Sequence, residues 1–194
     1  MPLDEMHDVP DEALLVLYAN GDAAAARVLA LRLTPKIYGV AYRMLGDAAE
    51  AEDLAQEAML RLWRIAPNWR SGEAQISTWL YRVVSNLATD RLRQRKRYGP
   101  PLDEIAEPES GAPSVTEQMQ GKARSEALQM ALNTLPERQK QAVILRHIEG
   151  LANPDIAQVM DITTEAVESL TARGKRTLAA ALAGRRAELG YSDE

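Results

Sequence analysis

The stretch Trp79–Arg97 constrains the fold of this chain most, because its apolar residues recur at steps of three and four. This spacing predicts an α-helix with one buried side, formed by Leu80, Val83, Val84, Leu87 and Leu92. The other side carries polar and cationic residues at the same steps, namely Arg82, Asn86, Thr89, Arg93 and Arg97. Such side chains hydrogen-bond to base edges and phosphates. Two interpretations follow: a nucleic-acid-binding helix, or a solvated amphipathic helix with a basic end.

The composition predicts an all-α protein. A chain of 194 residues with 46% hydrophobic residues is long enough for one domain or two small ones. Ala and Leu dominate and β-branched runs are short, which favours helices. The absence of Cys excludes disulfides and thiolate zinc sites, and no apolar run is long enough to cross a membrane. The acidic first residues do not resemble a secretion signal, so we expect a cytoplasmic location and no membrane insertion.

The net charge of −5 argues at first against a free-standing DNA-binding protein, because cations supply most non-specific affinity for DNA. The acidity is concentrated outside the predicted folded parts. Residues 11–97 carry 13 bases and 10 acids, and residues 121–194 carry 10 of each. Both parts are therefore compatible with weak DNA binding.

Helix signals divide the first part of the chain. A short helix is expected over Asp11–Asn20, and a second begins at Asp22 and ends at Gly46-Asp47. Pro35 is expected to kink or split this second helix near Leu33–Thr34. A third helix is expected over Ala48–Ala66, where Pro67 stops it.

One face of the third predicted helix mixes carboxylates, an amide, a thioether and an indole. Its members are Glu52, Asp53, Gln56, Glu57, Met59, Leu60 and Trp63. This mixture suits a protein interface, and the solvated acidic side of a core helix accounts for the same spacing. A catalytic carboxylate pair would need a neighbouring His, nucleophile or metal cluster, and none is present. We therefore predict no catalytic residues and no enzymatic activity.

Two connecting segments follow different patterns. The loop 67–78 contains Trp69, whose indole would either stack on an unpaired base or pack on the core. Residues 98–120 contain four prolines, five acids and no base, which predicts a flexible linker. The expected domains are therefore residues 1–97 and 121–194.

The second domain is expected to contain a helix-turn-helix. Helices near Lys122–Thr134 and Pro136–Glu149 precede a short helix, Asp155–Met160, with Asn153 as its N-cap. A turn at residues 161–163 leads to a long helix, Thr164–Leu189, capped by Thr163. An ordinary helical hairpin is the alternative. The two histidines, His7 and His147, have no ligand partner at a useful spacing, so no metal site or cofactor is predicted.

Three motifs together resemble the extracytoplasmic-function sigma factors of bacterial RNA polymerase. AEDLAQEAMLRLW at 51–63 resembles the region 2 segment that binds the polymerase clamp. STWLYRVVSNLATDRLR at 77–93 resembles the segment that opens and recognises the −10 element. The segment 135–178, which begins LPERQKQAVILRHIEG, resembles region 4, which recognises the −35 element. The order of the motifs and the linker between them match the family.

The resemblance implies a role for each matching residue. Core RNA polymerase would be bound by Glu52, Asp53, Gln56, Glu57 and Trp63. The −10 DNA would be contacted by Trp69, Arg82, Asn86, Thr89, Arg93, Arg95, Lys96 and Arg97. The −35 DNA would be contacted by Arg146, Thr164, Glu168, Ser169, Arg173, Lys175 and Arg176.

Three positions depart from the family pattern. Glu168 stands where many members carry Lys or Arg, and a carboxylate in the major groove accepts only from a donor such as cytosine N4. Gly174 replaces a usual Ala, and Trp69 replaces a common Phe. The −35 sequence and the details of base capture are therefore not transferred from the family.

The resemblance also implies partners. It is greatest to the proteobacterial sigma-E type, which a zinc-binding anti-sigma factor keeps inactive, and any zinc would belong to that partner. The expected function is promoter-specific initiation with core RNA polymerase on promoter DNA. The alternatives are a sigma mimic that sequesters an anti-sigma factor without binding DNA, and a free-standing helix-turn-helix regulator.

Overall fold

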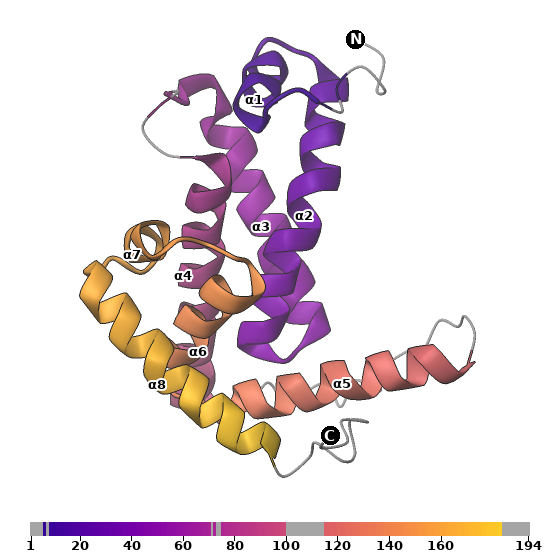
Figure 1. Ribbon diagram of the computed structural model, residues 1–194. Helices are drawn as coiled ribbons and strands as arrows, with labels where there is room; N and C mark the ends of the chain where they lie inside the picture. The colour runs from indigo at the N-terminus through magenta and orange to yellow at the C-terminus, as the bar shows by residue number, and fades with distance from the viewer. Residues whose placement is uncertain (1–5, 7, 71, 73–74, 100–114, 184–194) are drawn as a thin grey trace.

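The computed structural model describes residues 6, 8–70, 72, 75–99 and 115–183, and these residues contain α-helices and no strand (Figure 1). The prediction of an all-α fold is confirmed. Helices α1–α4 form an upright bundle, and α5–α8 lie against its lower half (Figure 1). His7, which was predicted to bind no metal, lies outside the described residues.

The first bundle begins with α1 (Asp11–Ala19), α2 (Ala23–Leu45) and α3 (Ala48–Ile65). Asp22 caps α2 by accepting from the backbone N–H groups of Ala24 and Ala25, at 2.9 and 3.3 Å. Gly46 ends α2 in the left-handed conformation, and Asp47 caps α3 through the N–H of Glu50 at 2.9 Å. A 3-10 turn (Ala66–Asn68) follows, and α4 spans Ile76–Tyr98.

Pro35 does not split α2, which continues as one helix from Ala23 to Leu45. Proline removes the hydrogen bond to the carbonyl four residues earlier, here that of Leu31. Leu31 is 67% exposed, so this position lies on the solvent side of the helix. Leu33 and Ile37 are buried on either side of the proline and hold both halves of α2 on the core.

The second group contains α5 (Val115–Asn133), α6 (Glu137–Val143), a π-helical turn (Ile144–Ile148), α7 (Asn153–Met160) and α8 (Thr164–Ala183). Helix α5 begins earlier than its predicted start near Lys122, so residues 115–120 are not linker. The linker prediction averaged over a window whose prolines all lie at or before Pro113, whereas the Glu, Gln and Met residues that follow favour a helix. Residues 100–114 and 184–194 lie outside the described part of the chain.

One apolar cluster extends through both groups of helices. It includes Leu29, Leu62 and Leu80 from the first group, and Ile144 and Val167 from the second. The fully buried residues of α4 also include Ser85 and Ala88, and α7 packs against α4 in addition to α2 and α3. As a result, α4 has two covered sides and one narrow exposed side.

Candidate nucleic-acid and protein interfaces

The exposed side of α4 carries the polar residues predicted to contact nucleic acid. Arg82, Asn86 and Arg93 are exposed, and Thr89 is partly exposed. Leu80 and Val84 are buried on the opposite side, as predicted, and Val83, Leu87 and Leu92 are partly buried. This geometry leaves one amide, one hydroxyl and guanidinium groups in a row along the helix, where they can hydrogen-bond to bases and phosphates.

The basic end of α4 is divided between solvent and the protein. Arg95 does not face outward with its neighbours, because its guanidinium forms an ion pair with Glu50 at 2.8 Å and donates to the carbonyl of Leu45 at 3.2 Å. Arg91 also approaches Glu50, at 3.9 Å, and Lys96 pairs with Glu137 at 3.2 Å. The acid partners lie on other helices, so the predicted run of phosphate-binding cations is partly neutralised within the chain.

Trp69 packs against the bundle in this structure. Its ring meets that of Trp79 edge to face, with 6.0 Å between centroids and an angle of 86° between planes. The indole N–H is buried, and no hydrogen-bond acceptor reaches it among the described residues. A buried N–H group without an acceptor costs free energy. The packing of Trp69 against the bundle therefore carries this penalty. Residues 71, 73 and 74 of the same loop are outside the described residues.

The predicted protein-binding face of α3 is narrower than its sequence spacing indicates. Glu52, Asp53 and Gln56 are exposed, and Leu60 is 48% exposed. Met59 is buried at 6% exposure, so its placement on the interface was wrong. At four residues from Ala55 and three from Leu62, Met59 shares the inner side of the helix with both.

The two ends of this face are held by neighbouring side chains. The carboxylate of Glu57 accepts from Arg61 at 2.8 Å, and this hydrogen bond lowers the pKa of Glu57. Trp63 is half-buried, and its ring lies 4.7 Å from that of Tyr18 at an angle of 57°. Trp63 therefore presents part of one indole surface to solvent.

A tyrosine pair on α2 extends the same surface and was not predicted. Tyr38 and Tyr42 stack with 6.1 Å between centroids and 13° between planes. Burial raises the pKa of Tyr38 first, and the charge of Glu52 adds to the effect, which places Glu52 close to the pair. Their spacing of four residues on one helix was the available sequence signal.

Helices α7 and α8 form the predicted helix-turn-helix. Asp161 ends α7 with a positive φ of 52°, and the hydroxyl of Thr163 accepts from the N–H of Ala166 at 3.3 Å to cap α8. Ile156, Val159 and Val167 are buried between the two helices. The tight turn and its small apolar core fix the crossing of α7 and α8.

The outer face of α8 presents Glu168, Ser169 and Arg173 to solvent, with Thr164 partly exposed. Asn153 is not the N-cap of α7, a position that belongs to Ala152. Its amide instead donates to the carboxylate of Glu168 at 3.4 Å. The prediction of the cap was wrong because the helix begins one residue earlier, so the Asn153 side chain meets the neighbouring helix rather than its own first turn.

Cations surround the base of this face. Arg146, Lys175 and Arg176 are exposed, and Arg146 donates to the carbonyl of Leu151 at 2.8 Å. Burial lowers the pKa of His147, and the charges of Lys175 and Arg146 lower it further. Arg146 and Lys175 therefore lie in one electrostatic neighbourhood, although they are far apart in sequence.

The described part of the chain contains neither a metal-binding cluster nor a membrane-spanning helix. No group of three or more His, Cys, Asp or Glu residues is arranged there to hold a metal ion. None of its helices is long and apolar enough to cross a membrane.

Comparison with known proteins identifies the family. The Sigma-70 region 2 model matches residues 29–98, and the Sigma-70 region 4 model matches residues 125–178. The sigma-H factor of Pseudomonas aeruginosa RNA polymerase is 33% identical over 181 residues, which cover 89% of this chain and 93% of that protein. The ECF sigma factor SigE of Mycolicibacterium smegmatis is 33% identical over 184 residues, covering 91% and 70%. The chain belongs to the extracytoplasmic-function sigma factors.

Solved structures agree with this sigma-factor fold. CnrH in complex with the cytosolic domain of CnrY has a TM-score of 0.66 and 18% identity, and covers 90% of this chain and 97% of that one. The sigma factor RpoE of Bartonella quintana, in complex with the anti-sigma factor NepR, has a TM-score of 0.62 and 22% identity, covering 79% and 93%.

The family matches fall on the surfaces described above. The exposed residues of α3 and α4 lie within the region 2 match, and the outer face of α8 lies within the region 4 match through Arg176. As an alternative sigma factor, this chain is a transcription initiation factor. Its helix-turn-helix belongs to the DNA-binding region 4.

Proposed function

We propose that this sigma factor binds core RNA polymerase through α3 and directs it to −35 and −10 promoter elements. The observation that carries the proposal is the presence of three separate exposed faces on one chain. The acidic and amide face of α3 suits a protein partner, and the faces of α4 and α8 suit DNA. The chain catalyses no reaction itself, and it acts in the cytoplasm, where polymerase and chromosome are found.

The polymerase-binding surface comprises Glu52, Asp53 and Gln56, with Glu57 and Trp63 at its ends. The exposed Leu60 and the Tyr38–Tyr42 pair add apolar area beside these charged residues. Protein interfaces combine such apolar area with a polar rim. A partner that places cations opposite these acids and an apolar side chain near Leu60 would fit.

Different residues of the promoter-binding surfaces would contact bases and phosphates. On α4, Arg82, Asn86 and Thr89 would contact −10 bases, and Arg93 and Arg97 would contact phosphates. Arg95 and Lys96 can join them only by leaving their present acid partners. Trp69 can capture a flipped base only by leaving Trp79, and its buried indole N–H lowers the cost of that step.

On the second domain, residues 121–194 in the sequence-based division, the −35 element would lie across α8. Glu168 and Ser169 would face base edges, together with Thr164, and Arg173 would contact the DNA beside them. Arg146, Lys175 and Arg176 would bind phosphates around this face. The carboxylate of Glu168 selects for a base that donates, which favours cytosine at one position of the −35 element.

Control by an anti-sigma factor is part of the proposal. Support comes from two solved structures of the same fold that are complexes: the sigma factor RpoE is bound to the anti-sigma factor NepR, and CnrH is bound to the cytosolic domain of CnrY. We propose that any zinc in such a complex is bound by the partner.

Transcription with purified components tests the proposal. The protein is added to core polymerase and a library of promoters, and transcripts that depend on both −35 and −10 sequences are expected. A mobility-shift assay on the same DNA compares the protein alone with the holoenzyme. A sigma mimic would give no shift in either case, and a free-standing regulator would shift DNA without polymerase.

A further inference from the structure

The carboxylate of Glu168 is held by a side chain from the neighbouring helix. Asn153, the first residue of α7, donates from its amide nitrogen to Glu168 Oε1 at 3.4 Å. Glu168 itself lies 15 residues later, in the second turn of α8, and is exposed. Within the described part of the chain, no cation forms an ion pair with this carboxylate. The amide of Asn153 is therefore the group that determines where the carboxylate lies.

Asn153 is available for this contact because it does not cap its own helix. The N-cap position of α7 is Ala152, whose carbonyl accepts from the N–H of Ile156 at 3.1 Å, and no side chain caps the helix. Pro154 follows in the first turn, where its missing N–H would have had no helical acceptor. The first turn of α7 therefore forms without the Asn153 amide, which reaches across to α8 instead.

Glu168 lies in the part of α8 that is proposed to meet the −35 bases. Thr164 precedes it by four residues and so shares its side of the helix. Ser169 follows it, and Arg173 Nε donates to the carbonyl of Ser169 at 3.2 Å, which folds the guanidinium back toward the same region. The hydrogen bond from Asn153 thus lies at one edge of the proposed base-contacting face.

This hydrogen bond restricts what the carboxylate of Glu168 can do in a major groove. An ionised carboxylate only accepts hydrogen bonds, so Oε1 is occupied by Asn153 and Oε2 remains for a base. Cytosine offers its N4 amino group, whereas adenine offers N6 beside the acceptor N7, which repels a carboxylate oxygen. A long Glu side chain also loses rotamer freedom when it binds, and holding it in place beforehand reduces that loss. A held carboxylate therefore meets a donor at one place in the groove.

We propose that Asn153 is a positioning residue for −35 recognition. Its amide holds the carboxylate of Glu168 so that Oε2 accepts from cytosine N4 and discriminates against the other three bases. Asn153 contacts no base and acts through Glu168, so the choice of base depends on the first residue of α7 as well as on α8. This inference rests on the proposed function, because it requires α8 to lie in the major groove of the −35 element.

Selection from promoters with randomised −35 elements tests this role, with the full-length protein bound to core polymerase. The wild-type holoenzyme is expected to enrich cytosine at one −35 position. Asn153→Ala should reduce the ratio of cytosine to the other bases at that position by about three- to tenfold, the range expected for the loss of one hydrogen bond, and leave the other positions unchanged. Asn153→Asp should reduce the ratio at least as much, because two carboxylates repel each other, although an acid in the first turn suits the helix.

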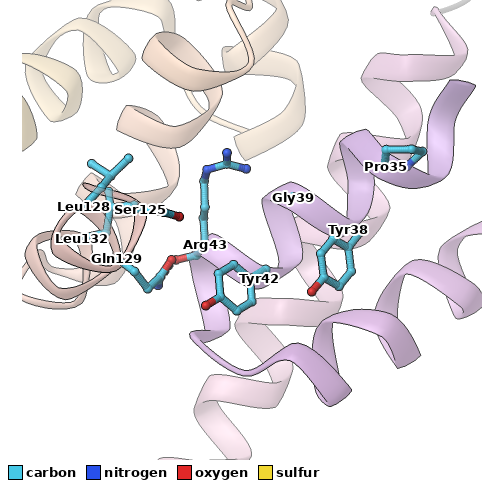
Figure 2. Close-up of a pocket in the computed structure, with 9 residues that line it drawn as sticks. All are labelled: Pro35, Tyr38, Gly39, Tyr42, Arg43, Ser125, Leu128, Gln129 and Leu132. Carbon is cyan, nitrogen blue, oxygen red and sulfur yellow. Dashed lines mark hydrogen bonds between the residues drawn. The ribbon is translucent and has the colours of Figure 1, made fainter. Parts of the chain in front are cut away.

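Glu168→Ala separates positioning from direct contact with DNA. In that background Asn153→Ala should have no further effect on base preference, because the carboxylate that the amide holds is gone. Gln158→Ala is the matched control, since it removes an exposed amide from the same helix and should keep the cytosine preference. Gln129→Ala should keep it as well. That variant removes an amide that donates to the carbonyl of Arg43 at 3.1 Å, beside a cavity of about 290 Å³ between α2 and α5 (Figure 2), and so controls for the loss of a polar contact elsewhere in the fold.

Three outcomes would overturn the role of Asn153: an unchanged cytosine preference in Asn153→Ala, an equal loss of binding to all −35 sequences, or an effect that persists in the Glu168→Ala background. The contact itself is tested by NMR of the free protein, where Glu168→Ala should shift the side-chain amide protons of Asn153. Unshifted protons would show that the contact is absent and would also overturn the role. A shift together with no −35 preference in the wild-type holoenzyme would refute the proposed function, and recognition through Asn153 with it, whereas the contact in the free chain would stand.

Discussion

Gly174 permits α8 to lie against α6, and adding one methyl group there tests how closely the two helices pack. A Cβ at this position would lie 2.6 Å from Val143 Cγ2 and 3.1 Å from the carbonyl oxygen of Gln139. The valine is 1% exposed and β-branched, so it cannot turn away easily. Gly174→Ala therefore forces the helices apart or strains Val143.

Two effects of opposite sign decide the free energy of unfolding of Gly174→Ala. Alanine in a helix interior is favoured over glycine by about 1 kcal/mol. Overpacking a buried contact costs roughly 1 to 3 kcal/mol. Because the contact is as short as 2.6 Å and the neighbour is rigid, overpacking should exceed the gain in helix propensity. The free energy of unfolding is expected to fall by about 1 kcal/mol.

Urea denaturation followed by circular dichroism measures this loss, with Gly39→Ala as the matched control. Gly39 is also inside a helix, but its Cβ would meet the Arg43 guanidinium, the mobile end of a long side chain, with Nη1 at 2.7 Å and Cζ at 3.9 Å. The control should therefore be neutral or stabilised by up to about 1 kcal/mol.

A double-mutant cycle with Val143→Ala completes the test. Removing the valine methyl groups should reverse the sign of the Gly174→Ala effect, giving a coupling of about 1 to 2 kcal/mol. A Gly174→Ala protein that is more stable than the wild type, or effects that simply add, would refute the close packing of α6 and α8.

Four further predictions concern the binding faces. Gln56→Ala should weaken binding to core polymerase with no change in helical content, and equal retention in a pull-down would remove Gln56 from that interface. Asn86→Ala should lower transcription only on templates with an intact −10 element, so a similar loss on −10-mutated templates would speak against base contact. Glu168→Gln should change the preferred −35 base from cytosine toward adenine in a selection from random sequences, and an unchanged preference would show that Glu168 faces no base. Glu50→Gln should release Arg91, whereas Arg95 keeps Asp47 at 3.7 Å and the Leu45 carbonyl at 3.2 Å. It should therefore steepen the salt dependence of DNA binding by about one phosphate contact, which Glu12→Gln, with the same change in net charge, should not do.

The helices and the helix-turn-helix were predictable because their signals are local. The N-caps of α2, α3 and α8 are Asp22, Asp47 and Thr163, each directly before its helix. The C-cap of α2 is Gly46, the residue directly after the helix. Apolar spacing identified the buried side of α4 for the same reason, since side chains three and four residues apart share a face. No information from distant parts of the chain was required.

The features that sequence reasoning missed depend on distant residues. Arg95 was assigned to phosphates with its neighbours, and its acid partner Glu50 lies 45 positions earlier. The second covered side of α4 arises from α7, more than 50 residues later, so a single-helix pattern could not show it. The contact between Tyr81 and Glu149 likewise joins elements that no spacing rule connects.

The net charge of −5 and the ion pairs of α4 bear on the same question, namely how strongly the free chain can bind DNA. Affinity for DNA rises with the number of phosphates that cations neutralise. On α4 most cations already have acid partners: Arg91 and Arg95 share Glu50, Arg93 lies 3.7 Å from Asp90, and Lys96 pairs with Glu137. Among these pairs, only that of Lys96 crosses between the two halves of the chain. Because most cations of α4 are already paired within the chain, the free protein is expected to bind DNA weakly, and polymerase would supply the remaining phosphate contacts.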